Sequence, residues 1–158
     1  MQIMEYSAAY GEDVKDLLVE LQNYIAALDR EGYNVLTGEF RETYFADTMR
    51  EIKEKDGKLF LAVEGGKAVG MVAGIVLEEE RTCAFAAPKG GRVTELVVAQ
   101  SHRGQGIGRL LLRQMEEYFK GAGCARALLG VFEYNENAKS FYRRNNYANR
   151  ITDMMKQL

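Results

Sequence analysis

The sequence contains little histidine, cysteine or proline. Its 158 residues include one histidine (His102), two cysteines (Cys83 and Cys124), one proline and no tryptophan. A single histidine excludes any site that needs two, and the absence of a C-x-x-C spacing argues against both a metal site and a disulfide framework. Acidic and basic residues nearly balance, 23 against 21, so the basic surface of a general nucleic-acid binder is missing. We therefore expect reduced thiols, no metal and no nucleic-acid partner.

Long apolar runs are missing as well. No segment approaches the roughly 20 apolar residues of a membrane helix, and residues 1–10 lack the basic start and apolar stretch of a signal peptide. We therefore expect no membrane partner and a cytoplasmic protein. Hydrophobic residues make up 47% of the chain and charged residues 28%, which is typical of a globular protein. No segment resembles a linker, so residues 1–158 are predicted to form a single domain.

The hydrophobic period changes along the chain and predicts the order of elements. Apolar residues three and four apart predict helices over about 11–28, 39–55, 104–121 and 135–145. Alternating or continuous apolar runs predict strands over 2–6, 58–64, 68–78, 92–99, 125–132 and 147–156. The predicted order is β-α-α-β-β-β-α-β-α-β, an α/β domain with a mixed (α+β) sheet and a strand–helix–strand unit at its centre.

The segment from Glu95 to Leu112 is the most informative one chemically. An apolar strand runs into a turn with glycines at 104, 106 and 108, and this turn opens an amphipathic helix. The first turn of a helix has unpaired N–H groups, which together with the helix dipole favour an anion. The glycines keep side chains away from these amides, and Arg103 and Arg109 add charged donors. The segment predicts a phosphate or pyrophosphate site, although an ordinary strand-to-helix connection can look similar.

The glycine spacing narrows the choice of ligand. No Lys-Ser or Lys-Thr follows the glycines, as a P-loop requires, and the dinucleotide pattern G-x-G-x-x-G is not met. Residues 103–108, Arg-Gly-Gln-Gly-Ile-Gly, instead match the pattern Q/R-x-x-G-x-G/A of the GNAT acetyltransferase family. Residues 135–142 match the family's second element, N-x-x-A-x-x-L/F-Y. With the strand order, the chain resembles this family over nearly its whole length.

The resemblance implies a GNAT-like acyl-CoA N-acyltransferase fold and an enzyme that uses acetyl-CoA. Such an enzyme transfers the acetyl group to a primary amine of a small molecule, peptide or protein, by direct attack of the amine. The backbone amides of residues 103–108 would hold the pyrophosphate, and a splayed pair of central strands would receive the pantetheine arm. The implied acetyl-CoA-binding residues are Leu96, Val97, Val98, Arg103, Gly104, Gln105, Gly106, Ile107, Gly108, Arg109 and Asn135. The alternatives are an acyl-CoA binding or sensing module without catalysis and a nucleotide-binding switch.

Two residues are candidates for catalysis. Tyr142 matches the position where the family commonly places a general acid, and a phenol with an ordinary pKa of about 10 can donate its proton as a thiolate forms; the alternative is a core tyrosine beside Phe141. Glu95 lies on the strand where the family often carries an acidic residue, and it would act as a base or an amine anchor. Strand alternation predicts that Thr94 points to the opposite face, so Glu95 is only structural if the substrate lies there.

Further expectations concern the acceptor side and the C-terminal part. Aromatic and acidic residues of the first two helices and of the loop at 79–91 are expected to line the acceptor site and to suit an amine cation. These residues are Tyr24, Asp29, Tyr33, Glu39, Tyr44, Phe45, Glu78, Glu79 and Glu80. Asn135 is expected to hold the pantetheine arm, to cap the last helix, or both. His102 is expected to be exposed.

Two features of the C-terminal end complete the prediction. The chain has Asn146-Tyr147 where the family often has Gly-Phe. Asparagine tolerates the left-handed conformation, so we expect the turn to be kept. The apolar residues Ile151, Met154 and Met155 fit either a strand-mediated homodimer or the core of a monomer.

Overall fold

The computed structural model describes residues 1–157. Its main sheet has five strands in the order β1-β2-β3-β6-β7. They are β1 (Gln2–Glu5), β2 (Lys58–Glu64), β3 (Lys67–Leu77), β6 (Gly90–Val98) and β7 (Arg126–Leu128). All neighbours are antiparallel except β6 and β7, which are parallel. The mixed sheet confirms the predicted fold class.

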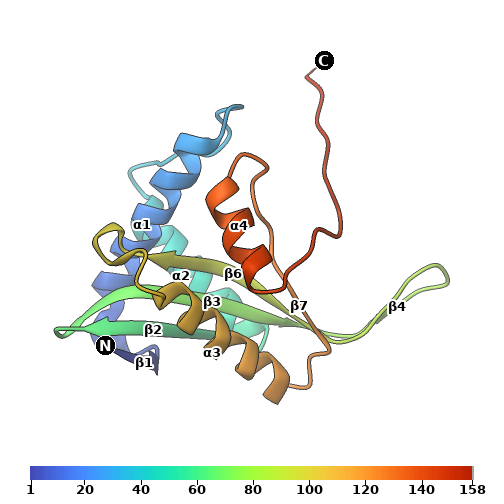
Figure 1. Cartoon of the computed structure of the whole chain (residues 1–158), viewed down its shortest axis with the longest axis horizontal. Coiled ribbons are helices and arrows are strands. Elements are labelled where there is room, and N and C mark those ends of the chain that lie inside the picture. Colours follow the sequence, from blue (N-terminus) through green and yellow to red (C-terminus); the bar gives the residue numbers. More distant parts are fainter. Residues whose placement is uncertain (158) are drawn as a thin grey trace.

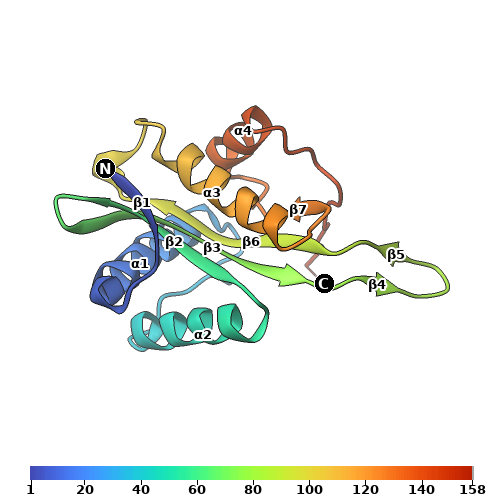
Figure 2. The same cartoon turned by 90° about the horizontal axis from the view of Figure 1, so that it is seen from below.

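Four helices cover the two faces of this sheet (Figures 1 and 2). Helices α1 (Gly11–Leu28) and α2 (Phe40–Glu54) lie on one face, and α3 (Ile107–Gly121) and α4 (Glu136–Arg144) lie on the other. Because both faces are covered, Ala68–Val76 of β3 is buried continuously rather than alternately. None of the helices in the described residues combines the length and the apolar character needed to cross a membrane.

Alternation along the strands divides the apolar residues between two cores. Leu59, Leu61 and Met71 pack with α1, whereas Phe60, Ala62 and Val72 pack with α3. Helix α3 lies very close to the sheet where β3 and β6 carry Gly74 and Gly91, since a side chain at either glycine would collide with the ring of Phe119. This close packing fixes the helix whose N-terminus forms the predicted phosphate site.

Strand β6 pairs with the short strand β7 only at its beginning. The parallel register joins Gly90–Arg92 to Arg126–Leu128, and beyond Arg92 strand β6 has no further strand partner on this side within residues 1–157. The chain after Leu128 instead leads to α4, which lies on the same face of the sheet as α3 (Figure 2). Because β7 ends at Leu128, one edge of β6 beyond Arg92 has no strand beside it in the described residues, and the splayed pair of strands implied by the resemblance stays a prediction.

The structure corrects the sequence prediction at two places outside the centre. The predicted last strand, 147–156, is wrong, because residues 147–157 contain no helix or strand. Ile151, Met154 and Met155 are 71%, 94% and 58% exposed. They therefore do not pack into the core of a monomer. The polar stretch after β3 contains a small hairpin, β4 (Glu80–Arg81) and β5 (Ala86–Ala87), which projects from the sheet (Figure 2).

Candidate active site

The glycine turn leaves the N-terminus of α3 open. The short 3₁₀ helix η2 (Gln100–His102) follows β6, and Gly104 and Gly106 then adopt φ angles of 77° and 83°. These left-handed conformations are readily available only to glycine. No side chain within residues 1–157 caps α3, and nothing lies within 4 Å of where a Cβ of Gly104 or Gly106 would stand. The geometry suits an anion that approaches the amides of the first helical turn.

Arg103 holds this turn against α1. Its Nε donates to the carbonyl of Val98 at 2.9 Å, and its Nη2 donates to Glu20 Oε1 at 2.6 Å. The same Glu20 oxygen accepts the backbone N–H of Gln100 at 2.9 Å. The Arg103 side chain is therefore exposed but bonded to the protein itself, whereas Arg109, also exposed, lies on the first turn of α3. That Arg103 donates hydrogen bonds to a phosphate stays a prediction, and it would require the bonds of Arg103 to Val98 and Glu20 to change.

Asn135 begins α4 and links it to α1. Its Oδ1 accepts the N–H of Ala138 at 3.0 Å, so the predicted N-cap is confirmed. The same oxygen accepts the hydroxyl of Tyr24 at 3.2 Å. The Tyr24 ring in turn lies 5.7 Å from the guanidinium of Arg103. Helix α1 therefore contacts both segments that the family resemblance assigns to the donor, the turn after β6 and the start of α4.

The turn after α4 has the predicted conformation. Asn146 has a φ of 66°, and the N–H of Tyr147 donates to the carbonyl of Tyr142 at 3.0 Å. The expectation that asparagine would replace glycine here is confirmed. The expected exposure of His102 is wrong, because its half-buried imidazole lies 3.5 Å from a Glu64 carboxylate oxygen at the end of β2.

Tyr142 lies on α4 in an aromatic cluster. Its ring makes edge contacts with Phe141 and Tyr147, at centroid distances of 5.1 and 5.7 Å. Burial, and secondly the nearby charge of Glu95, raises the pKa of Tyr142 to about 12. The charge of Glu95 on β6 thus affects the pKa of Tyr142 on α4.

A bulge in β6 sets the direction of Glu95. Ala73 pairs with Glu95 and Gly74 pairs with Val93, so Thr94 is an extra residue in the ladder. Thr94 and Glu95 both line a pocket of about 290 Å³ between α2 and β6. The expectation that Thr94 points to the opposite face is therefore wrong, because a bulge interrupts strand alternation.

Glu95 is half-buried and receives one short hydrogen bond. Tyr44 of α2 donates its hydroxyl to Glu95 Oε1 at 2.5 Å. Burial raises the pKa of Glu95 to about 7, the Tyr44 hydrogen bond opposes this shift, and the charge of Glu51 adds to it. Burial and the Glu95 charge raise the pKa of Tyr44 above its usual range. Glu95 thus changes charge near neutral pH, as a general base should.

The rest of this pocket is formed by one side of α2. Tyr44, which was expected to line the acceptor site, lines this pocket, and Glu51, Glu54 and Thr94 were not identified from the sequence. The spacing of Tyr44, Thr48, Glu51 and Lys55 along the helix could have placed them on one face. Two cations in the pocket are already paired, Arg50 with Asp47 at 2.7 Å and Lys55 with Glu51 at 2.7 Å.

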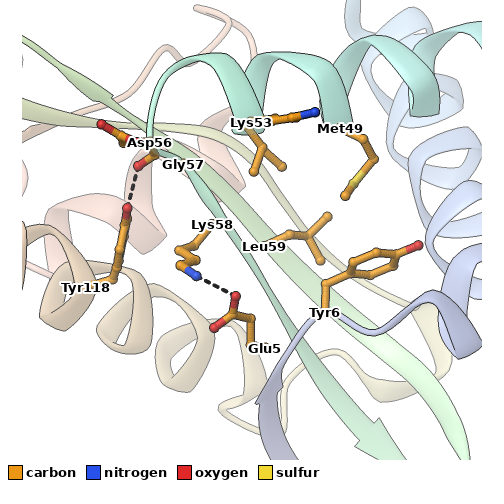
Figure 3. A pocket seen from close by; sticks show the side chains of 10 residues that line it. Glu5, Tyr6, Met49, Lys53, Asp56, Gly57, Lys58, Leu59 and Tyr118 are labelled. Atoms are coloured by element: carbon orange, nitrogen blue, oxygen red, sulfur yellow. Dashed lines mark hydrogen bonds and ion pairs between the residues drawn. The ribbon is translucent and has the colours of Figure 1, made fainter.

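A second pocket, of about 340 Å³, lies between α2, β1, β2 and the C-terminal end of α3 (Figure 3). Its polar groups are bonded to each other: Lys58 pairs with Glu5 at 2.6 Å, and the Tyr118 hydroxyl donates to the carbonyl of Asp56. It lies at the opposite end of α3 from the glycine turn and contains none of the predicted site residues. The smaller pocket at Glu95 is therefore the candidate active site.

The mixed sheet, the open glycine turn and a half-buried carboxylate on β6 together are typical of an acyltransferase-like domain. The sequence profile described as "Acetyltransferase (GNAT) family" matches residues 23–147. This chain therefore belongs to the GNAT acetyltransferase family, and the resemblance noted in the sequence is confirmed.

Individual relatives agree with this assignment. N-acetyltransferase family 8 member 2 of Rattus norvegicus is 28% identical over 102 residues, which is 62% of this chain and 42% of that protein. The chain thus spans less than half the length of this relative. A tetramutant of the BH1408 protein from Bacillus halodurans has the same fold, with a TM-score of 0.82 and 21% identity over both complete chains. The aminoglycoside N-acetyltransferase AAC(6')-Iy in complex with CoA has a TM-score of 0.71 and 13% identity, with 99% and 100% of the two chains covered.

Proposed function

We propose that this protein is an acetyl-CoA-dependent N-acetyltransferase that acetylates a primary amine of a small molecule or a peptide. The observation that carries this proposal is the position of Glu95. It is a half-buried carboxylate with a pKa of about 7, it lines a pocket on the α2 side, and it lies on the part of β6 that β7 leaves unpaired. Family membership supports the reaction type.

The donor site is proposed at the glycine turn and along β6. The open amides after Gly106 suit a pyrophosphate, and Gln105, Ile107, Gly108 and Arg109 surround them. Leu96, Val97 and Val98 form the edge of β6 that β7 leaves free. Asn135, which caps α4 and accepts the Tyr24 hydroxyl, is proposed to contact the pantetheine arm. Bound acetyl-CoA would supply an acetyl group activated as a thioester.

Glu95 is proposed to accept the proton that an ammonium substrate must lose. The neutral amine nitrogen then attacks the acetyl carbon directly, so that an N–C bond forms and the C–S bond breaks. The nitrogen releases its second proton to solvent as the amide forms. The acceptor would lie in the 290 Å³ pocket beside Tyr44 and Glu51. The carboxylates of this pocket and the aromatic ring of Tyr44 suit a cation. Above pH 7 Glu95 is ionised and can accept the proton, whereas below pH 7 it is protonated and the reaction slows.

Tyr142 is proposed to donate a hydrogen bond where negative charge develops on the sulfur. Its pKa of about 12 keeps the phenol protonated at any working pH. Complete proton transfer to a thiolate would be uphill, since an ordinary thiol has a pKa of about 8.5. The benefit of Tyr142 therefore comes from the hydrogen bond in the transition state, and the thiolate can take its final proton from water.

The proposed function is tested first by ligand binding and thiol release. Acetyl-CoA at about 100 times its Kd should stabilise the protein by roughly 2.7 kcal/mol, which corresponds to a Tm increase of about 5–10 °C. Coenzyme A release is then measured with spermidine, kanamycin, glucosamine 6-phosphate and a lysine peptide. Stabilisation without amine-dependent release would favour a binding module, and stabilisation by ATP alone would favour a nucleotide switch.

Replacing Tyr142 by phenylalanine tests the acid side of the mechanism. We expect kcat to fall by about 10–100-fold, because one hydrogen bond to a developing charge is lost. The Kd for acetyl-CoA should change less than about twofold, since the aromatic packing with Phe141 and Tyr147 is kept. Tyr118→Phe is the matched control, because its hydroxyl bonds to Asp56 at the far end of α3. Equal turnover of the two variants would remove Tyr142 from the mechanism.

A further inference from the structure

We propose that Tyr44 is a positioning residue that orients the Glu95 carboxylate, so that one oxygen is held by α2 and the other faces the amine. This inference deepens the proposed function and rests on it. Tyr44 lies 51 residues away from Glu95 in sequence and comes from a different element, α2. Tyr44 lies outside both family motifs, which cover residues 103–108 and 135–142.

The hydrogen bond determines which Glu95 oxygen is free. The Tyr44 hydroxyl is 2.5 Å from Glu95 Oε1, whereas Oε2 accepts no hydrogen bond from any residue between 1 and 157. A carboxylate has acceptor capacity on both oxygens. Oε2 is therefore the atom that can accept a proton from an amine, directly or through water, and Oε1 is the atom that fixes its direction.

The Tyr44 ring is itself held in place. It stacks on Phe40 one helical turn earlier, with a centroid distance of 4.7 Å and an angle of 17° between the rings. A phenol has few rotatable bonds, so a stacked ring aims its hydroxyl with little loss of entropy. The bulge at Thr94 turns Glu95 toward this hydroxyl from the side of β6. Two separate features of the fold thus meet in one hydrogen bond.

The charges around Glu95 act in different directions. Tyr44 stabilises the ionised form by donating a hydrogen bond, whereas burial and the charge of Glu51 favour the protonated form. The remaining titratable groups that face the pocket or affect Glu95 are Asp47, Arg50, Glu54 and Lys55 of α2 and Tyr142 of α4. Arg50 and Lys55 form ion pairs with Asp47 and Glu51. The direct hydrogen bond to Glu95 comes from Tyr44.

Tyr44→Phe tests the role, because it removes the hydroxyl and keeps the ring that stacks on Phe40. We expect the pKa of Glu95 to rise by about one unit. We also expect kcat to fall about 10-fold, since a misdirected base contributes less, and the acid limb of the pH–rate profile to move up by the same amount as the pKa. Tyr10→Phe is the control: Tyr10 packs against the same α1-side core, so neither quantity should change.

The pKa of Glu95 is measured in the full chain by a ¹³C-carboxyl NMR titration, assigned with Glu95→Gln, without acetyl-CoA or amine. The pH–rate profile is measured by coenzyme A release with the best amine among spermidine, kanamycin, glucosamine 6-phosphate and the lysine peptide. An unchanged Glu95 pKa in Tyr44→Phe would overturn the inference, and so would a raised pKa that the acid limb does not follow. A wild-type protein inactive on all four amines would instead count against the proposed function, which the NMR titration does not depend on.

Discussion

Glu95→Gln is expected to lower kcat by about 10²–10³-fold, which is the usual contribution of a general base. The amide keeps the size of the side chain and can still accept the Tyr44 hydroxyl, but it cannot take a proton from an ammonium ion. The rise of activity with pH near 7 should disappear from the profile, because the group that titrates there is gone. The measurement is coenzyme A release between pH 5.5 and 9 with a responsive amine.

The same substitution is expected to stabilise the fold at alkaline pH. The folded-state pKa of Glu95, about 7, lies above its ordinary value of 4.5, so the native protein holds a proton that the unfolded chain releases between these pH values. Wild-type stability therefore falls as pH rises from 4.5 to 7, and the deficit persists above 7. Glu95→Gln should exceed the wild type by about 1–3 kcal/mol in urea unfolding at pH 8, and this advantage should vanish near pH 4.5.

Glu117→Gln provides the comparison for both measurements. Glu117 is an exposed carboxylate on α3 that pairs with Lys120 at 2.9 Å, so turnover should be kept and stability should not rise at pH 8. A Glu95→Gln variant that retains both full turnover and the wild-type pH profile would show that Glu95 is not the base. A Glu95→Gln variant that loses turnover but is no more stable than the wild type at pH 8 would show that the ionised carboxylate does not lower the free energy of unfolding.

Local features of this protein could be predicted from the sequence, because neighbouring residues determine them. The glycine turn, the Asn135 cap and the left-handed Asn146 each depend on a few consecutive residues whose backbone preferences are well known. The helices followed from their apolar period, and family membership followed from two short motifs. These are the parts of the prediction that the structure and the comparisons confirmed.

Features that depend on distant residues could not be predicted in this way. The bulge at Thr94 arises from the register between β3 and β6, and a period of two contains no sign of it. Glu20 and Arg103 are 83 residues apart, and Tyr44 and Glu95 are 51 residues apart. Neither hydrogen bond could be seen in the sequence. The expected strand at 147–156 is absent, and the alternation of apolar residues alone does not show whether a segment pairs with a strand. Glu95 was a candidate from the sequence, but its hydrogen bond to Tyr44 could be found only in the fold.

Gly106→Val is expected to reduce the affinity for acetyl-CoA by about 100-fold. Gly106 has a φ of 83°, and its missing side chain faces open space at the uncapped start of α3. A valine there would be strained by about 1–2 kcal/mol or more, and its methyl groups would stand in front of the first-turn amides. The loss of hydrogen bonds from these amides to a charged group would account for the 100-fold effect. Isothermal titration with acetyl-CoA gives the Kd, and urea unfolding without ligand gives the strain.

Gly66→Val separates the strain from the loss of the site. Gly66 lies in the β2–β3 hairpin with a φ of 80°, and it also has open space where a side chain would stand. The two substitutions therefore impose the same backbone strain and should lower the free energy of unfolding by similar amounts. Only Gly106→Val places a side chain at the proposed pyrophosphate site, so only this variant should lose affinity. Equal affinities in the two variants would place the donor phosphates somewhere other than the start of α3, because the strain alone would then explain everything that valine does at Gly106.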